Sequence, residues 1–316
     1  MDVLGFLLRN SLYFFVPLLI VAIGGMYSEK SGVLNIALEG IMIIGAFCGI
    51  LFMHYMQDYM SGQVLLICAM LISMIAGAAF TMLHAFASIS LKADQTISAT
   101  ALNTFAAAFA VFVARAVVGQ QQVYFDNTFR FTIPVLSDIP IIGDAFFKDA
   151  YLTTFIGIAI LIVTVFVFKK TRYGLRLSAC GENPQAADSL GINVYKTRYS
   201  ALIISGMLGG LGGLAYIVPI VNNFGGDVAG YGFLALSVLI LGQWKPLRLL
   251  VAALFFSLMK TLASGYMSVP FLANSGLPDT FYKCLPYVIT LVVLAVGSKN
   301  SIGPKAAGQP YDKGKR

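Results

Sequence analysis

Residues 199–221 read YSALIISGMLGGLGGLAYIVPIV, a run of apolar and small side chains that contains no charge. A helix needs about 20 mainly apolar residues to cross the hydrocarbon layer of a bilayer, so this run predicts a membrane-spanning helix. Its five glycines give two overlapping pairs of small residues four positions apart. Because such spacings let helices approach closely in lipid, we interpret them as a packing surface rather than a substrate site.

Further runs of the same kind lie on both sides of this one. The run 228–243 is short and flanked by glycine, and 62–90 is long enough to tilt or break, so we expect eight to ten spans and count nine. Continuous hydrophobicity argues against the alternating pattern of a membrane β-barrel. The sequence therefore predicts an all-α, polytopic membrane protein with residues 1–316 in a single transmembrane domain. The other runs are 11–28, 33–56, 62–90, 95–118, 151–168, 247–268 and 280–297.

Composition supports a membrane environment. Hydrophobic residues make up 58% of the chain and charged residues 11%, with a mean hydropathy of +0.83. Soluble proteins carry roughly 25% charged residues. The formal net charge of +7 is spread over short polar segments between apolar runs, so we expect no nucleic-acid partner. The four cysteines are scattered without metal-ligand spacing, and we expect no metal site.

The positions of lysine and arginine predict the orientation, because these residues collect on the cytoplasmic side. Segment 169–198 carries six basic and two acidic residues, and segment 298–316 carries five basic residues and one acidic residue. We predict a cytoplasmic loop and a basic cytoplasmic tail there. Segment 119–150 has four aspartates against Arg130 and Lys148, which predicts an extracellular loop. Nine alternating spans then place the N-terminus outside, with Arg9 as an exception.

The cytoplasmic segment contains RYGLRLSACGENPQAADSLGIN, residues 172–193. Asn183 suits the N-cap of a helix, Pro184 its first position, and Gly191 the residue just beyond its end. The predicted helix has about two turns, too few to be stable alone in water. Such a helix is suited to docking into a groove of a partner protein; a structured loop without a partner is the alternative.

Four stretches carry a resemblance to a known family. GENPQAADSLGI (181–192) resembles the coupling-helix motif of ABC importer permeases for branched-chain amino acids, simple sugars and nucleosides. Three others resemble the sugar and nucleoside branch, and its nucleoside members most closely. The four stretches cover most of the chain, whose length resembles the shorter of the two permeases that such systems pair. These three are GVLNIALEGIMIIGAF (32–47), LKADQTISATALN (91–103) and GYGFLALSVLILGQWKP (230–246).

The resemblance implies an ABC importer permease fold and a subunit without enzyme activity, in a bacterial inner membrane. Its cargo would be nucleosides or simple sugars. It implies three partners: a second, non-identical permease, a lipid-anchored substrate-binding protein, and an ATPase that holds ATP and Mg²⁺. The chain itself has no G-x-x-x-x-G-K-[ST] phosphate loop. We expect segment 119–150 to contact the binding protein or to cap the pathway mouth. The predicted ATPase-coupling residues are Asn183, Pro184, Ala186, Ala187, Asp188 and Gly191.

Polar residues inside apolar runs are candidates for the pathway, because such groups are costly in lipid. Glu39 follows Asn35 by four positions, so a helix would place both on one face. In the family this stretch lies near a break between two spans, and Glu39 either lines the pathway or bonds a neighbouring helix. Asn103 and Lys260 each have a substrate-binding and a packing interpretation. We expect no direct Glu39–Lys260 ion pair, since roughly 9 Å separates them along the membrane normal.

Two rival functions differ from an ATP-driven importer. A secondary transporter would use Glu39 as its proton carrier. A membrane-embedded enzyme is disfavoured, because His54 and His84 are isolated and no nucleophile–base or metal-ligand cluster stands out.

Overall fold

The computed structural model describes residues 3–126, 129–132, 134, 143, 147–268, 278–297 and 303–314. The long helices are α1 (Val3–Lys30), α2 (Leu38–Met56), α3 (Gly62–Ala85), α4 (Gln95–Val118), α6 (Leu152–Lys170), α9 (Val194–Ile220), α11 (Pro246–Gly265) and α13 (Asp279–Gly297). Shorter elements are α7 (Arg172–Glu182), α8 (Pro184–Ser189), α10 (Tyr231–Leu241), the π-helical η1 (Phe86–Ser90), the 3-10 helix η2 (Tyr266–Ser268), and strands β1 (Val123–Tyr124) and β2 (Asn223–Phe224).

The prediction of an all-α, polytopic membrane protein is confirmed. Among the described residues, seven helices are long and apolar enough to cross a membrane. The predicted runs 228–243 and 280–297 correspond to shorter apolar helices, of which the first is Tyr231–Leu241. The seven are Leu8–Lys30, Leu38–Met56, Gly62–Ser90, Gln95–Val118, Leu152–Lys170, Val194–Ile220 and Pro246–Gly265.

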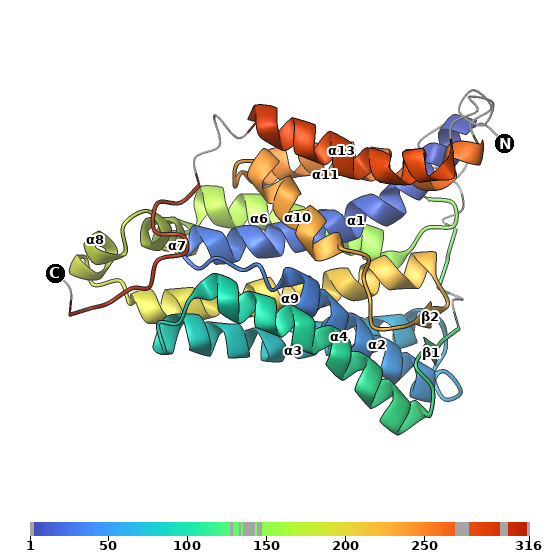
Figure 1. Ribbon diagram of the computed structural model, residues 1–316, viewed down its shortest axis with the longest axis horizontal. Coiled ribbons are helices and arrows are strands. Elements are labelled where there is room, and N and C mark those ends of the chain that lie inside the picture. The colour runs from blue at the N-terminus through green and yellow to red at the C-terminus, as the bar shows by residue number, and fades with distance from the viewer. Residues whose placement is uncertain are drawn as a thin grey trace.

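The two ends of the bundle differ in what they carry (Figure 1). Helices α7 and α8 lie at one end with the C-terminus, whereas the start of α1 lies at the other end with β1 and β2. If α8 faces the cytoplasm, the N-terminus faces outside, as the charge pattern predicts. Arg9, the exception to that pattern, donates from Nη1 to Asp149 Oδ2 at 3.0 Å, so an acid of the predicted outer loop balances it.

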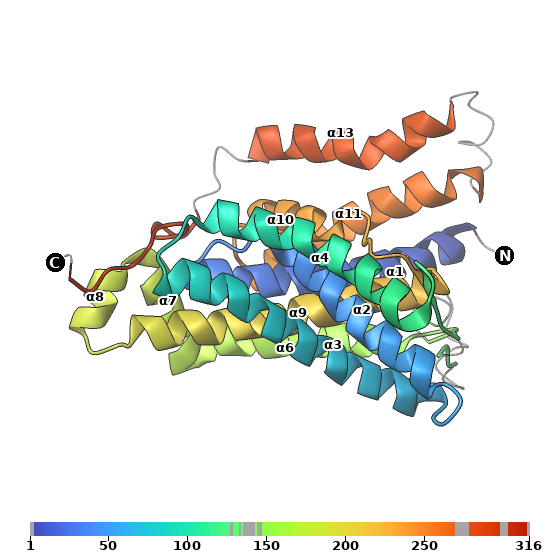
Figure 2. The same cartoon turned by 60° about the horizontal axis from the view of Figure 1, so that its bottom comes forward.

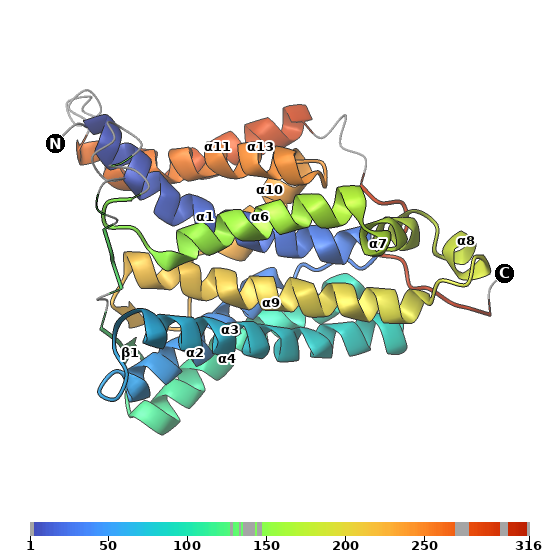
Figure 3. The ribbon, with the colours of Figure 1, turned by 180° about the vertical axis from the view of Figure 1, so that it is seen from behind.

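Helix α9 occupies the centre of the packing, and its glycines explain how. Figure 3 shows α9 running between α6 and α3. A Cβ added to Gly210 would collide with the carbonyl oxygen of Ser73 on α3. One added to Gly213 would collide with the carbonyl oxygen of Met42 on α2. The predicted packing surface is therefore confirmed, since only a residue without a side chain lets these backbones approach so closely.

The outer faces of the bundle are apolar. Phe112 on α4 is 70% exposed and Ile162 on α6 is 64% exposed. Figure 2 shows α13 at the edge of the bundle, beside α11. Large exposed apolar side chains on several helices are expected of a protein whose solvent is lipid.

Candidate translocation pathway and coupling surface

The chain between α1 and α2, residues 31–37, runs through the bundle without helical structure. The prediction of one helical run over 33–56 is therefore wrong at its start, and α2 begins at Leu38. Helix α1 ends because Gly32 adopts a left-handed φ of 91° and Val33 N donates back to the Ser28 carbonyl at 3.3 Å. We call residues 31–37 the re-entrant segment, since they return the chain from the end of α1 into the bundle (Figure 1).

Side chains of neighbouring helices bind the backbone of the re-entrant segment. Leu34 N donates to Gln95 Oε1 at 2.7 Å, and His84 Nε2 donates to the Leu34 carbonyl at 3.0 Å. Irregular backbone at membrane depth is tolerated only where its polar groups find such partners. His84, isolated in the sequence, is thus part of a polar clamp in space.

Asn103 completes this clamp from α4. Its Oδ1 accepts from Gly40 N at 2.8 Å, and its Nδ2 donates to the Ile36 carbonyl at 3.0 Å. Both polar ends of the amide therefore bind the backbone where the re-entrant segment passes into α2. This contact corresponds to the packing interpretation of Asn103 that the sequence left open.

We expect Asn103→Leu to lower the thermal midpoint of the detergent-purified protein by several degrees. The apolar side chain leaves Gly40 N–H and the Ile36 carbonyl without partners, at a cost of about 1–3 kcal/mol for each buried group. Thr104→Ala is the matched control, because Thr104 is exposed on the same helix. Equal midpoints for the two variants, measured by size exclusion after heating, would contradict the clamp.

Glu39 binds the beginning of another helix. Its carboxylate is 7% exposed; Oε1 accepts from Gly230 N at 2.9 Å and Oε2 accepts from Gly232 N at 2.6 Å. Gly230 and Gly232 lie at the start of α10, so Glu39 caps a helix N-terminus, where a negative charge is favoured. Both α2 and α10 begin between the two ends of the bundle (Figure 1).

The other two pathway candidates, Asn35 and Lys260, do not form a common site with Glu39. Asn35 precedes α2 and donates from Nδ2 to Ser205 Oγ at 3.0 Å, so the predicted helical face shared with Glu39 is wrong. The Asn35 Oδ1 has no hydrogen-bond partner in the part of the chain that the structure describes. Lys260 is half-buried on α11, and the Glu39 carboxylate binds backbone amides instead. A substrate contact for Asn35 or Lys260 stays a prediction.

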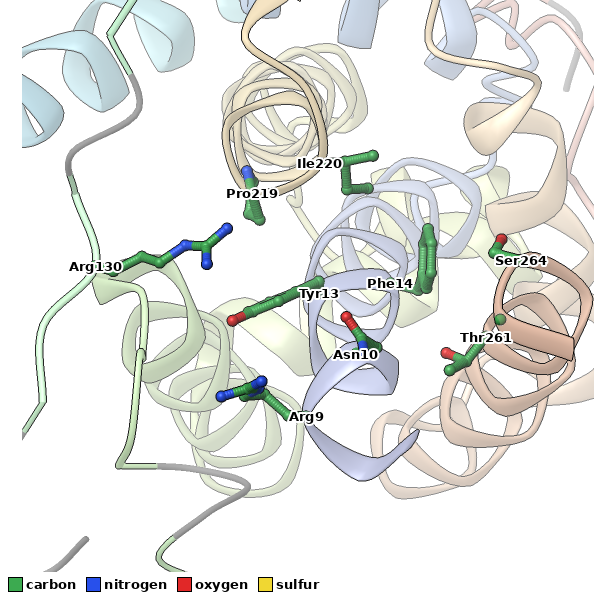
Figure 4. A pocket seen from close by; sticks show the side chains of 10 residues that line it. Arg9, Asn10, Tyr13, Phe14, Arg130, Pro219, Ile220, Thr261 and Ser264 are labelled. Carbon is green, nitrogen blue, oxygen red and sulfur yellow. The ribbon is translucent and has the colours of Figure 1, made fainter. Parts of the chain in front are cut away.

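Two cavities open near the end of the bundle where α1 starts. The first has a volume of about 360 Å³ between α1, α9 and α11. In Figure 4, Arg9, Tyr13 and Arg130 lie on one side of it and Thr261 and Ser264 on the other. The second has a volume of about 220 Å³, and Ile220 borders both. The second is lined by Tyr216, Ile217, Ile220, Val221, Asn223, Phe224, Gly225, Asp227 and Ala229.

Three aromatic rings connect the linings of these cavities. Phe14 borders the first cavity, and its ring centroid is 6.3 Å from that of Tyr231. Tyr231 stacks on Tyr216, which borders the second cavity, with 4.0 Å between centroids. Tyr231 is also the first residue of α10. Because Glu39 fixes the start of that helix, the buried carboxylate also positions the rings between the two cavities.

The described part of segment 119–150 packs on the same end. Strand β1 pairs antiparallel with β2, Gln63 Nε2 donates to the Phe129 carbonyl at 2.8 Å, and Arg130 Nε donates to Tyr151 Oη at 2.9 Å. Hydrogen bonding to Tyr151 raises the pKa of the Arg130 guanidinium, which therefore stays charged at the edge of the first cavity. Asp138, Pro140 and Asp144 of the predicted loop lie outside the described residues.

At the opposite end, the capped helix predicted around residues 183–191 is present as α8. Asn183 Oδ1 accepts from Ala186 N at 3.0 Å, Pro184 occupies the first helical position, and Gly191 has a φ of 78°. The preceding helix α7 begins with a similar cap, in which Thr171 Oγ1 accepts from Gly174 N at 3.2 Å.

Some of the predicted coupling residues are buried within this chain, and others are exposed and available to a partner. Ala187 is 2% exposed and packs in a cluster with Cys180, Val194 and Tyr311. Pro184 is buried as well, whereas Asn183 and Ala186 are exposed and Asp188 is half-buried. Leu190, which is not among the predicted coupling residues, is 82% exposed directly after α8. Its signal in the sequence is a leucine placed before the glycine that ends the helix. The outward surface is therefore centred on Ala186 and Leu190.

Neither end carries a metal centre in the described ranges, where no group of three or more His, Cys, Asp or Glu residues could hold an ion. The described part of the chain thus has two cavities at one end of the bundle and the exposed side chains of Ala186 and Leu190 at the other.

Comparison with known proteins gives full-length matches. Residues 7–294 match the family described as the permease component of branched-chain amino acid transport systems. The chain is 39% identical over 318 residues to the guanosine ABC transporter permease protein NupQ of Bacillus subtilis, covering 100% of this chain and 99% of NupQ. It is 39% identical over 316 residues to the nucleoside ABC transporter permease protein NupC of Lactococcus lactis, covering 99% of each. A second permease of that organism, NupB, is 25% identical and covers 88% of this chain and 76% of NupB. No solved structure matches the chain.

Proposed function

This chain belongs to the permease family of branched-chain amino acid transport systems, and we propose that it is the subunit through which an ATP-driven importer moves nucleosides across a bacterial inner membrane. The observation that carries the cargo assignment is the full-length similarity, at 39% identity, to permeases named for guanosine and for nucleosides. The chain is a transport subunit and a multi-pass membrane protein rather than an enzyme.

The partners follow from the two ends of the bundle. An ATPase that binds ATP and Mg²⁺ would dock against α8, where Ala186 and Leu190 face outward. A lipid-anchored binding protein would deliver cargo at the opposite end, where segment 119–150 borders the first cavity through Arg130. We further propose a heterodimer, because Lactococcus lactis has both NupB and NupC, two permeases to which this chain is similar.

The cavity linings suit a nucleoside. Tyr13 and Phe14 offer apolar faces for a base, while the exposed Ser264 offers a hydroxyl that can bond a ribose hydroxyl. Aromatic rings with a few polar groups are typical of sites for ligands of this mixed character.

Uptake of labelled guanosine by cells that express the complete importer tests the cargo. We expect unlabelled purine and pyrimidine nucleosides to compete, and free ribose and free base to compete at least about tenfold less well, because either half makes only part of the contacts. Competition by ribose equal to that by nucleosides would instead assign the importer to simple sugars.

The rival function, proton-coupled secondary transport through Glu39, makes a separate prediction. Uptake would then collapse on addition of an uncoupler at constant ATP, and no ATPase would copurify with the chain. Glu39 accepts hydrogen bonds from two backbone amides at the start of α10, which supports a helix-capping role over that of a proton carrier.

A further inference from the structure

The described part of the C-terminal tail lies across the end of the bundle that carries α8. We call residues 303–312 the C-terminal strap; Figure 1 shows it beside α7 and α8. Ala306 N donates to the Gly181 carbonyl at 2.8 Å, which joins the strap to the end of α7. Asp312 pairs with Lys92, between η1 and α4, with 3.0 Å between Oδ1 and Nζ. The strap thus connects the end of α7 with the loop between η1 and α4, two segments that are far apart in the sequence.

Arg198 lies beneath the strap and is one of the most buried large side chains. It is 1% exposed, in the second turn of α9. Its Nη1 donates to the Gln309 carbonyl of the strap at 3.3 Å, and its guanidinium carbon lies 5.9 Å from the centroid of the Tyr311 ring. Neither of the two ion pairs described above, Arg9–Asp149 and Lys92–Asp312, involves Arg198. A buried cation held by carbonyls and a ring is stable only while those groups stay in place.

The other side of Arg198 contacts the re-entrant segment. Its Nε donates to the Ser31 carbonyl at 3.2 Å, just past the C-terminal end of α1, where a cation is favoured. The space is closed there, since a Cβ added to Gly32 would lie 2.7 Å from Arg198 Nη2. Displacement of Arg198 along its own helix axis would therefore push or pull the turn at Ser31 and Gly32.

A continuous route of contacts follows. Helix α8 ends at Ser189, and a short turn connects it to Asn193, the N-cap of α9, the helix that carries Arg198. Arg198 binds Ser31, and the re-entrant segment leads to Glu39, which holds the N-terminus of α10. We propose that Arg198, clamped by the C-terminal strap, is the positioning residue that transmits movement of α8 to the re-entrant segment and hence to α10. This inference rests on the proposed function, because it takes α8 as the ATPase docking site.

The strap is an essential part of this link. Without Gln309 and Tyr311, the guanidinium of Arg198 would be exposed to water. It would also lose its contacts on the side opposite Ser31. Tyr311 is 4% exposed, and its ring lies 5.4 Å from that of Tyr195 on α9. The strap therefore holds Arg198 against the re-entrant segment from the cytoplasmic side.

The test compares Arg198→Gln and a chain ended after Gly308 with the unaltered complex, each purified with its partner subunits. We expect both variants to retain the ATPase subunit and basal ATP hydrolysis, and to lose guanosine uptake by about tenfold, within the usual range of coupling free energies. Lys196→Gln is the matched control, since it removes an exposed cation from the first turn of the same helix. We expect this control to transport at the unaltered rate.

Cys180 provides a direct readout of strap position. It is fully buried in the cluster that includes Tyr311, and burial raises the pKa of its thiol, so it reacts slowly with maleimides. In a complex with Cys48, Cys68 and Cys284 replaced by alanine, we expect the chain ended after Gly308 to expose Cys180 and to label it at least about tenfold faster.

The outcomes separate the two proposals. Equal uptake by Arg198→Gln and Lys196→Gln would overturn the role of Arg198 while leaving the importer intact. Loss of the ATPase subunit from Arg198→Gln would also overturn it, because the residue would then serve docking. If the unaltered complex imports guanosine with its ATPase inactivated, the proposed function itself fails.

Discussion

Leu190→Asp is expected to abolish capture of the ATPase and, with it, uptake. Leu190 is 82% exposed next to α8, so its side chain gains nothing from this chain alone. Burial of a leucine in a partner's groove contributes about 1.5–3 kcal/mol, and an unpaired carboxylate in its place adds a desolvation cost. Together these effects weaken docking by at least about a hundredfold, which exceeds what most single contacts supply.

Copurification of the ATPase with the affinity-tagged chain measures this effect. Leu190→Met is the matched control, because it keeps an apolar side chain of similar volume and is expected to retain the partner. The membrane fold stays intact in both variants, since the side chain points away from the bundle. An unchanged yield of ATPase with Leu190→Asp would rule out α8 as the docking surface.

The difference in exposure between Ala186 and Ala187 determines which of the two can be substituted to test docking. A bulky residue at Ala187 would force α8 away from Cys180, Val194 and Tyr311, because Ala187 is 2% exposed. Such a variant would lose uptake through misfolding of the loop as well as through docking. Ala186 is exposed one position earlier, so Ala186→Trp changes the docking surface without disturbing that cluster.

The parts of this fold that could be predicted are those with local causes. Asn183, Pro184 and Gly191 act within a few residues of themselves, so the ends of α8 follow from the sequence. The re-entrant segment does not follow from hydropathy, because Val33, Leu34, Ile36 and Ala37 extend the apolar run of α2; the expectation of a break there comes from the family resemblance. What interrupts the helix is a set of partners from other helices: His84 contacts Leu34 from 50 positions away, and Gln95 from 61. A hydropathy pattern contains no record of such contacts.

Arg198 illustrates the same limit for a charged residue. In the sequence it adds one more cation to segment 169–198 and helps to assign that segment to the cytoplasm. In the structure it is 1% exposed, and its hydrogen-bond partner in the strap lies 111 positions away. Charge patterning gives the side of the membrane on which a residue lies, but it does not distinguish a solvated cation from a buried one.

Glu39→Leu is expected to reduce uptake by at least about tenfold at equal expression, with Glu39→Gln between this variant and the unaltered chain. Leucine removes both acceptors from Gly230 N–H and Gly232 N–H, whereas glutamine keeps one. A buried donor left without its acceptor costs about 1–3 kcal/mol, so loss of both acceptors frees the start of α10 and the Tyr231 ring beside the cavities. Asp58→Asn, an exposed acid beyond the far end of α2, serves as the control.

The intermediate rate of Glu39→Gln is what separates a helix cap from a proton carrier. The glutamine side chain does not titrate near neutral pH. A carrier mechanism therefore predicts that Glu39→Gln and Glu39→Leu are equally inactive. A cap predicts graded loss, because one of the two bonds to α10 survives. Initial uptake rates of labelled guanosine, measured with and without an uncoupler at constant ATP, make the comparison. If the two variants were equally inactive and uptake were sensitive to the uncoupler, Glu39 would be a proton carrier and not a helix cap.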